Sequence, residues 1–231
     1  MSTPSIRRLA AILIADVVGY SRMMERDEPG THGRVARIRA EVTDPAVLRH
    51  GGRVVRSVGD GFLVEFPSAV SALEAAIEIQ RAMADRNRAV STHERIDHRI
   101  GINLGDILVD EHDIAGTGVN VAARLEALAP PGGIAVSATV REQVRQNLGI
   151  RFIDGGEHRV KNISRPVRVF HVGLDGAAPQ APARTGRGRR WAAALVLLAV
   201  FAGSWFTART GTQVAAPQTL VVLPFDHPAQ P

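Results

Sequence analysis

The stretch VVRSVGDGFLVEF, residues 54 to 66, contains two apolar runs separated by Gly59 and Asp60. A glycine and an aspartate between apolar runs are typical of a β-hairpin, because the two central residues of such a turn need a positive φ. The stretch therefore predicts antiparallel strands over 53 to 58 and 61 to 66, with Asp60 in the turn. It leaves open whether Asp60 also has a chemical role, and why the cation Arg56 lies just before it.

The sequence on both sides of this hairpin alternates between strand and helix patterns. Asp16 interrupts the N-terminal apolar run, which indicates a buried strand and not a signal peptide. The expected elements are a strand at 8 to 16, a helix at about 29 to 48, the hairpin, a helix through 68 to 87 with Ser68 as N-cap, a strand at 98 to 104 with a partner at 106 to 109, a helix at 117 to 128, and strands with a short helix to about 172. This β-α-β-β-α-β order predicts an α+β fold of the ferredoxin-like, split-βαβ type, a mixed or antiparallel sheet with helices on one face.

Composition limits the kinds of function that the chain can have. It has 231 residues, is 45% hydrophobic, contains no cysteine and carries a formal net charge of +5. Disulfides and thiolate metal sites are therefore excluded. Much of the positive charge lies after residue 173, where five arginines outnumber two aspartates, and no basic face stands out in the folded part. Nucleic-acid binding is therefore not expected.

The C-terminal part has the pattern of a membrane anchor. Residues 191 to 208, WAAALVLLAVFAGSWFTA, contain no charge and have a tryptophan near each end. A Pro/Ala/Gly/Arg linker over 173 to 190 precedes them. We expect a single transmembrane helix at 191 to 208 in the cell or inner membrane, with residues 1 to 172 forming a cytoplasmic domain. The tail over 209 to 231 would be extracytoplasmic; it is too short to fold alone and is expected to be truncated.

Two aspartates are candidate metal ligands. Asp16 ends the first strand and Asp60 lies in the hairpin turn, so both reach one edge of the sheet if the two strands are neighbours. Mg²⁺ prefers carboxylate oxygens and completes its octahedron with substrate phosphates. Gly61 would leave room for those phosphates. On spacing alone, purely structural roles for the two aspartates stay open.

A second candidate cluster lies in the stretch RIGINLGDILVDEHDIAGTGVNVAARLEAL, residues 99 to 128. Asn120 and Arg124 are four residues apart, so they share one face of a helix. Asp113 lies shortly before that helix. An acceptor, an amide and a guanidinium can read a purine edge, orient a ribose and hold a phosphate, respectively.

Five blocks in this order resemble the class III adenylate/guanylate cyclase catalytic domain in its bacterial, membrane-anchored form: ILIADVVGYS, VVRSVGDGFLVEF, RIGINLGDILVD, DIAGTGVNVAARLE and EHRVKNI. The resemblance covers residues 7 to 172. It implies an adenylate cyclase, which converts ATP to 3′,5′-cyclic AMP and pyrophosphate in signalling. It also implies a homodimer with active sites at the subunit interface, where one subunit supplies the metal ligands and the other the nucleotide ligands.

The resemblance also implies a role for each candidate residue. Asp16, Asp60 and the carbonyl of Val17 would bind two Mg²⁺ or Mn²⁺ ions. Asp113 would contact the adenine amino group, Asn120 would orient the ribose, Arg124 would stabilise the transition state at the α-phosphate, and Lys161 would bind the terminal phosphates.

Two positions bear on how closely the chain follows that pattern. Lys161 is the only lysine among 28 basic residues, and it falls where the family has its phosphate-binding lysine. Arg56 stands where adenylate cyclases usually have a lysine that contacts purine N1, whereas guanylate cyclases have an acid there. Two alternatives therefore stay open: a catalytically weak nucleotide-binding, dimerising membrane sensor, and a guanylate cyclase.

Overall fold

The computed structural model describes residues 6–110, 113–145, 149–159 and 166–174. Lys161, most of the predicted linker, the predicted membrane span and the tail lie outside these residues. Among the helices that are described, none is both long enough and apolar enough to cross a bilayer.

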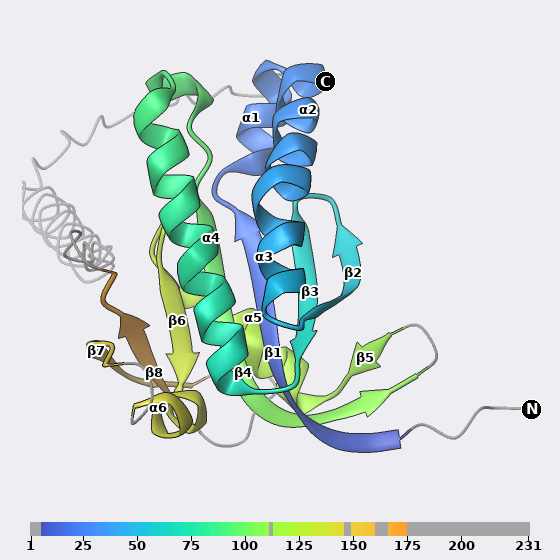
Figure 1. Cartoon of the computed structure of the whole chain (residues 1–231), viewed down its shortest axis with the longest axis vertical. Coiled ribbons are helices and arrows are strands. Elements are labelled where there is room, and N and C mark those ends of the chain that lie inside the picture. Colours follow the sequence, from blue (N-terminus) through green and yellow to red (C-terminus); the bar gives the residue numbers. More distant parts are fainter. Residues whose placement is uncertain (1–5, 111–112, 146–148, 160–165, 175–231) are drawn as a thin grey trace, which may run out of the picture. The chain divides into compact units, whose positions relative to one another are not determined.

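One mixed sheet forms the centre of the described domain (Figure 1). Its strands follow the order β2-β3-β1-β4-β6-β8-β7, and β5 pairs with β4 beside this path. β4 and β6 are parallel, and the other pairs are antiparallel. The strands are β1 (Ile6–Val17), β2 (Arg53–Val58), β3 (Gly61–Phe66), β4 (His98–Val109), β5 (Ile114–Ala115), β6 (Ile134–Ser137), β7 (Phe152–His158) and β8 (Val167–Val172).

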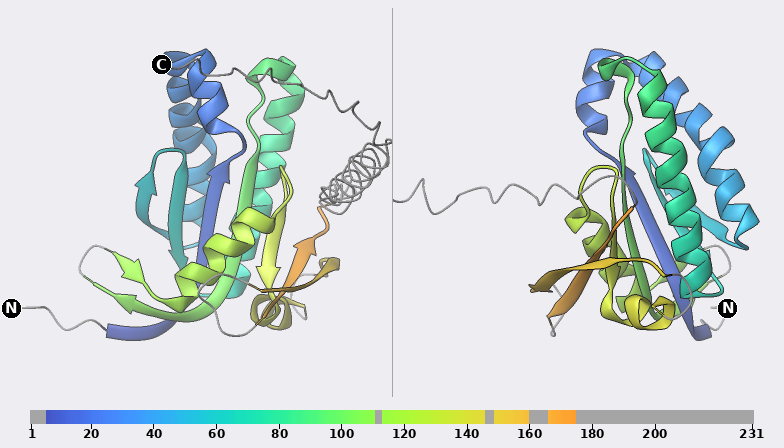
Figure 2. Two further views of the ribbon diagram at one scale, coloured as in Figure 1. Left: turned by 180° about the vertical axis from the view of Figure 1, so that it is seen from behind. Right: turned by 60° about the vertical axis from the view of Figure 1, so that its left-hand side comes forward.

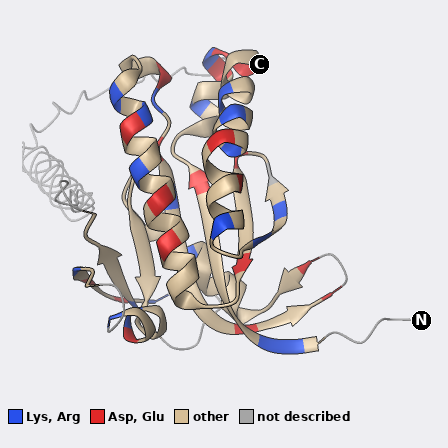
Figure 3. Cartoon of the chain, in the orientation of Figure 1, with Lys and Arg blue, Asp and Glu red and all other residues tan. Residues whose placement is uncertain are grey.

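The helices connect these strands. They are α1 (Tyr20–Arg26), α2 (Glu28–Ile38), α3 (Asp44–Arg49), α4 (Ala69–Ala89), α5 (Thr117–Leu128) and α6 (Ala138–Val144), with a π-helical segment at Arg39–Thr43 and a 3₁₀ turn at Thr92–Glu94. α4 begins as predicted, because the Ser68 hydroxyl accepts a hydrogen bond from the Ser71 N–H at 3.0 Å. Its apolar side packs on the sheet, while acidic and basic residues follow one another along its outer side (Figure 3).

The single helix predicted for 29 to 48 is wrong in detail. The chain stays helical there, but it passes through the π-helical segment between α2 and α3. Pro45 lies in the first turn of α3 and has no N–H to donate, so the regular hydrogen-bond pattern cannot run through it.

Helices cover both faces of the sheet, which corrects the prediction of one covered face. Alternate residues of β1 belong to different cores: Leu13 and Ala15 pack with α4, whereas Ala10 and Ile12 pack with α5. Figures 1 and 2 show α4 and α5 on opposite sides of the sheet. The cause is the central place of β1, because a strand that is apolar on both faces needs cover on both.

The predicted hairpin is confirmed, with β2 and β3 at the predicted bounds and Gly59 at φ 59°. The break predicted between 104 and 106 is wrong. β4 continues to Val109 because β1 pairs with it along its whole length, from Val17 opposite His98 to Ile6 opposite Val109.

Candidate active site

Asp16 and Asp60 meet at one edge of the sheet. β1 and β3 are antiparallel neighbours, with Ala15 opposite Phe62, so the turn before β3 lies beside the end of β1. The two carboxyl groups are joined by a hydrogen bond, and the Val17 N–H also donates to Asp60 Oδ2 at 3.3 Å. The structure thus brings together the two residues that the sequence predicted to be neighbours.

The surroundings of Asp60 disfavour its negative charge. The pKa of Asp60 is raised to about 6. Burial is the largest cause, and the hydrogen bond with Asp16 and the charge of Asp16 also contribute. A divalent cation would relieve this repulsion, so the pair fits Mg²⁺ or Mn²⁺. Within the described residues no three acidic or histidine side chains gather to hold a metal alone. Mg²⁺ commonly takes one or two carboxylates and then phosphate oxygens, and Asp16 and Asp60 supply two carboxylates.

A cavity of about 430 Å³ opens at this pair. Its floor contains Asp16, Val17 and Asp60, and its wall comes from the start of α1. Gly19 has φ 74° and precedes α1, so the chain turns sharply after the strand and brings the first turn of the helix over the carboxylates. Arg22 and Glu25 of α1 therefore line the cavity.

Arg56 and Asp113 form an ion pair, although they are 57 residues apart in sequence. Arg56 Nη1 donates to Asp113 Oδ2 at 2.9 Å, and both side chains are about half exposed. Asp113 lies just before β5, where its other oxygen accepts from the Ile114 N–H at 2.8 Å. The two residues assigned to the purine are thus adjacent within one subunit.

Helix α5 is pressed directly onto β4. A Cβ at Gly101 would lie 2.1 Å from the Glu126 nitrogen and 2.4 Å from the Ala122 oxygen, so only glycine permits this approach. Asn120 and Arg124 are exposed on the outer side of the helix, and neither lines a cavity with Asp16.

Glu126 lies on the other side of α5. It lines a cavity of about 260 Å³ together with Asp16, Arg56 and Gly61. Burial raises its pKa to about 7, the charge of Asp16 also raises it, and Arg99 opposes the rise. Arg99 is paired directly opposite Asp16 in the sheet. A third acid and a nearby cation therefore accompany the aspartate pair.

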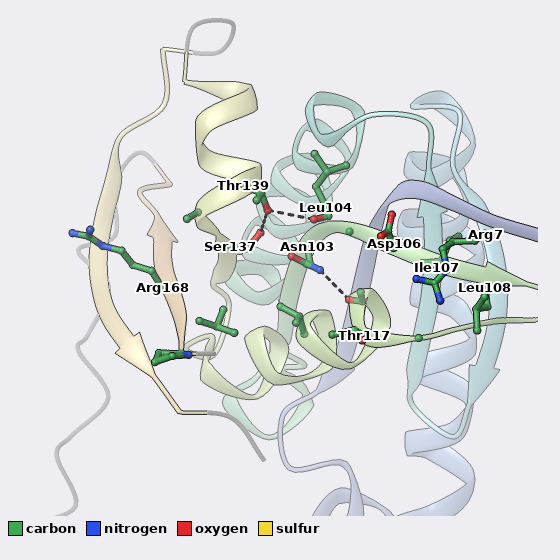
Figure 4. A pocket seen from close by; sticks show the side chains of 17 residues that line it. Arg7, Asn103, Leu104, Asp106, Ile107, Leu108, Thr117, Ser137, Thr139 and Arg168 are labelled. Carbon is green, nitrogen blue, oxygen red and sulfur yellow. Dashed lines mark hydrogen bonds between the residues drawn. The ribbon is translucent and has the colours of Figure 1, made fainter. Parts of the chain in front are cut away.

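A cavity of about 590 Å³ lies elsewhere, beside the start of α5 and the turn from β6 to α6. Figure 4 shows Asn103, Ser137 and Thr139 in it; Asn103 Nδ2 donates to the Gly118 oxygen at 3.0 Å. Ser137 and Thr139 hydrogen-bond each other at 2.8 Å. Among the residues that the structure describes, none of the predicted site residues lines this cavity.

Sequence reasoning missed Arg22, Arg99 and Glu126. Arg99 pairs across the sheet from Asp16, a relation that depends on the register between β1 and β4. Arg22 and Glu126 reach the aspartates only through the placement of α1 and α5. Glu126 lies two residues after Arg124, so the two side chains lie on different sides of the helix. The spacing that links Asn120 with Arg124 therefore gave no indication of Glu126.

Comparisons with known proteins agree with this geometry. The model of the family described as "Adenylate and Guanylate cyclase catalytic domain" matches residues 6–172. A protein of Rhizobium meliloti (strain 1021), provisionally named adenylate cyclase 3, is 54% identical over 171 residues, which cover 74% of this chain and 29% of that protein. The chain thus spans less than a third of that relative's length.

Solved structures show the same fold. The "Adenylate/Guanylate Cyclase/Hydrolase" from Silicibacter pomeroyi is 47% identical, with a TM-score of 0.71 over 74% of this chain and 100% of the other. The adenylyl cyclase CyaB from P. aeruginosa is 24% identical, with a TM-score of 0.66 over 78% of this chain and 100% of the other, and supports the fold alone.

Proposed function

Because this chain belongs to the adenylate and guanylate cyclase catalytic domain family, we propose that it converts ATP to 3′,5′-cyclic AMP and pyrophosphate. The observation that carries the proposal is the hydrogen-bonded pair of Asp16 and Asp60 at the edge of an open cavity. Such a pair would hold divalent cations, and their Lewis-acid chemistry would suit a reaction in which the ribose 3′-oxygen attacks the α-phosphorus of the triphosphate.

Asp16 and Asp60, with the Val17 carbonyl, would hold two Mg²⁺ or Mn²⁺ ions. Bound there, the ions would supply Lewis-acid chemistry, lowering the pKa of the 3′-hydroxyl and neutralising phosphate charge. The chain's own contribution is to place the two carboxylates side by side before substrate arrives. Gly61 adds no side chain to the cavity that it lines with Asp16, which leaves space for phosphate oxygens.

The remaining groups would come from a second copy of the chain. Asn120 and Arg124 lie on the exposed side of α5, and neither lines the described cavities that contain the aspartates of their own subunit. In a homodimer, Asn120 of one copy would orient the ribose held by the other, and Arg124 would donate to the α-phosphate as its charge grows. Lys161, outside the described residues, would bind the terminal phosphates.

The ion pair of Arg56 and Asp113 favours adenine. Adenine presents an acceptor at N1 and a donor at its amino group, whereas guanine presents a donor at N1 and an acceptor at O6. A fixed order of one donor, Arg56, and one acceptor, Asp113, matches adenine. For guanine the same order would place like hydrogen-bonding groups opposite each other.

We place the catalytic domain, residues 1 to 172, in the cytoplasm, anchored by the segment at 191 to 208 as a single-pass span of the cell membrane. The supporting observation is the uncharged sequence of that segment and the arginines before it. The tail at 209 to 231 would then be extracytoplasmic.

The test is product formation by the purified chain with Mn²⁺, given ATP and GTP side by side. We expect cyclic AMP to exceed cyclic GMP, and Asp60→Asn to abolish both. Asp85→Asn is the matched control, because Asp85 is an exposed aspartate on α4 that pairs with Arg88. Undiminished turnover by Asp60→Asn would contradict the metal assignment. Faster turnover of GTP would favour the guanylate cyclase, and tight ATP binding without product would favour the sensor.

A further inference from the structure

The cavity above the aspartate pair has an uneven charge. Its described lining includes three acids, Asp16, Asp60 and Glu25, and a single cation, Arg22. Two of the acids are the proposed metal ligands, so bound ions would neutralise them. Arg22 would then be the positive side chain that this subunit offers to whatever fills the cavity.

In the part of the chain that the structure describes, Arg22 has no competing contact that would hold it elsewhere. It lies in the first turn of α1, is exposed, and forms no ion pair or side-chain hydrogen bond among the described residues. Two arginines later in the chain are engaged, by contrast: Arg34 pairs with Asp27 at 3.2 Å and Arg39 with Asp44 at 3.3 Å. The guanidinium of Arg22 is thus free to bind a ligand.

We propose that Arg22 binds the terminal phosphates of the nucleotide in the same subunit as Asp16 and Asp60. This inference rests on the proposed cyclase function. Asp16 and Asp60 would hold the metal ions, which supply positive charge for a polyphosphate, and Arg22 lines the same cavity as these two aspartates. The planar guanidinium suits two phosphate oxygens at once.

Arg22 would take no part in bond making. The ribose 3′-hydroxyl gives up its proton to water as its oxygen bonds to the α-phosphorus. The bond from that phosphorus to the bridging oxygen breaks, and its electron pair leaves with pyrophosphate. Arg22 keeps its protons and donates hydrogen bonds to the oxygens of the leaving group. Its role is to bind, so its loss should act on affinity more than on the rate at saturation.

Glu25 provides a second test of the role of Arg22. It lines the same cavity without an ion pair to Arg22, and its carboxylate would repel phosphate. The competing view is that Arg22 is a solvated helix residue that merely balances Glu25. The two views predict different effects on affinity. If Arg22 binds phosphate, removing the charge of Glu25 should tighten polyphosphate binding; if Arg22 only balances Glu25, it should not.

The experiment is calorimetric titration of the purified, Mn²⁺-loaded chain with inorganic tripolyphosphate, alongside the KM for ATP. For Arg22→Gln we expect about tenfold weaker tripolyphosphate binding and a similar rise in KM, in keeping with the loss of a charge-assisted hydrogen bond. Arg22→Lys should lose less, and Glu25→Gln should bind more tightly. The difference between Arg22→Gln and the parent chain should shrink at high salt.

Arg26→Gln is the matched control, since Arg26 is an exposed arginine of the same helix that does not line the cavity. Equal effects of Arg22→Gln and Arg26→Gln, or no tripolyphosphate binding by the parent chain, would overturn the inference. Because this binding needs no cyclisation, it separates the two proposals. Binding that depends on Arg22 in a chain that makes no cyclic nucleotide would refute only the function, and cyclisation with an indifferent Arg22 would refute only this inference.

Discussion

Replacing Gly101 by alanine should damage both stability and catalysis, although Gly101 touches no substrate in the proposed mechanism. The added Cβ would lie 2.1 Å from the Glu126 nitrogen and 2.4 Å from the Ala122 oxygen. Both are backbone atoms of α5, so no rotamer change can make room. Ordinary contact begins at 3.4 Å, so the helix must move away from β4 by roughly 1 Å, and overpacking of this kind costs about 1–3 kcal/mol.

The same movement would carry Asn120 and Arg124 with the helix. A misplacement of about 1 Å in catalytic groups can reduce rate about 100-fold. We therefore expect kcat with Mn²⁺ and ATP to fall by up to that factor. The melting temperature should fall by roughly 2–4 °C for each kcal/mol lost in a domain of this size.

The control is Gly33→Ala, because a Cβ at Gly33 in α2 meets nothing within 4 Å. Alanine there should leave activity intact and raise helix stability by up to about 1 kcal/mol. If Gly101→Ala kept the parent's kcat and melting temperature, the direct contact between α5 and β4 could not be what positions the helix.

Three further outcomes follow from the charged groups. In chelator, Asp60 holds a proton in the folded state up to about pH 6 but releases it near 3.8 when unfolded, so folding stability should fall as pH rises through this range. Denaturant midpoints of the parent chain and of Asp60→Asn check this, and parallel pH profiles would contradict it. Glu65 is 7% exposed and pairs with Arg8 and Arg53, which are 44% and 51% exposed. Removing both arginines should lower the free energy of unfolding by about 3 kcal/mol or more, because the buried carboxylate would lose its partners. Glu65→Gln should cost only about 1 kcal/mol in the same unfolding assay, since the arginines can rehydrate; equal losses would refute this asymmetry. Arg56→Lys should keep the preference for ATP, whereas Arg56→Glu should lower the ATP-to-GTP turnover ratio about tenfold or more; an unchanged ratio would remove Arg56 from the purine site.

Local chemistry made part of the fold predictable. The hairpin and α5 have the predicted bounds because their signals lie within a few residues: Gly59 beside Asp60 for the turn, and a regular apolar stripe for the helix. The contact of Asp16 with Asp60 was also within reach, since it needed only the assumption that β1 and β3 are neighbours.

A second Gly-Asp dipeptide led to a wrong prediction, because contacts with another element decide the structure there. Gly105 and Asp106 resemble a turn, yet both lie inside β4. A Cβ at Gly105 would come within 3.2 Å of the Gly118 Cα, so this glycine serves close approach to α5 and not a reversal of the chain. Sequence periodicity cannot distinguish these two uses of glycine. Nor can it show which face of the sheet a helix covers, which is why the cover by α5 and the positions of Arg22 and Glu126 were missed.

Because β1 is buried on both faces, the number of residues in this strand decides which face Asp16 lies on. Asp16 faces the α5 side only because it lies four positions after Ile12, an even step along the strand. Deleting one residue between them would turn the carboxylate toward the α4 core and bring core side chains to the substrate side. Evolution can therefore exchange apolar residues within the strand far more freely than it can insert or delete one. The count of residues before Asp16 is as much a part of the site as the aspartate itself.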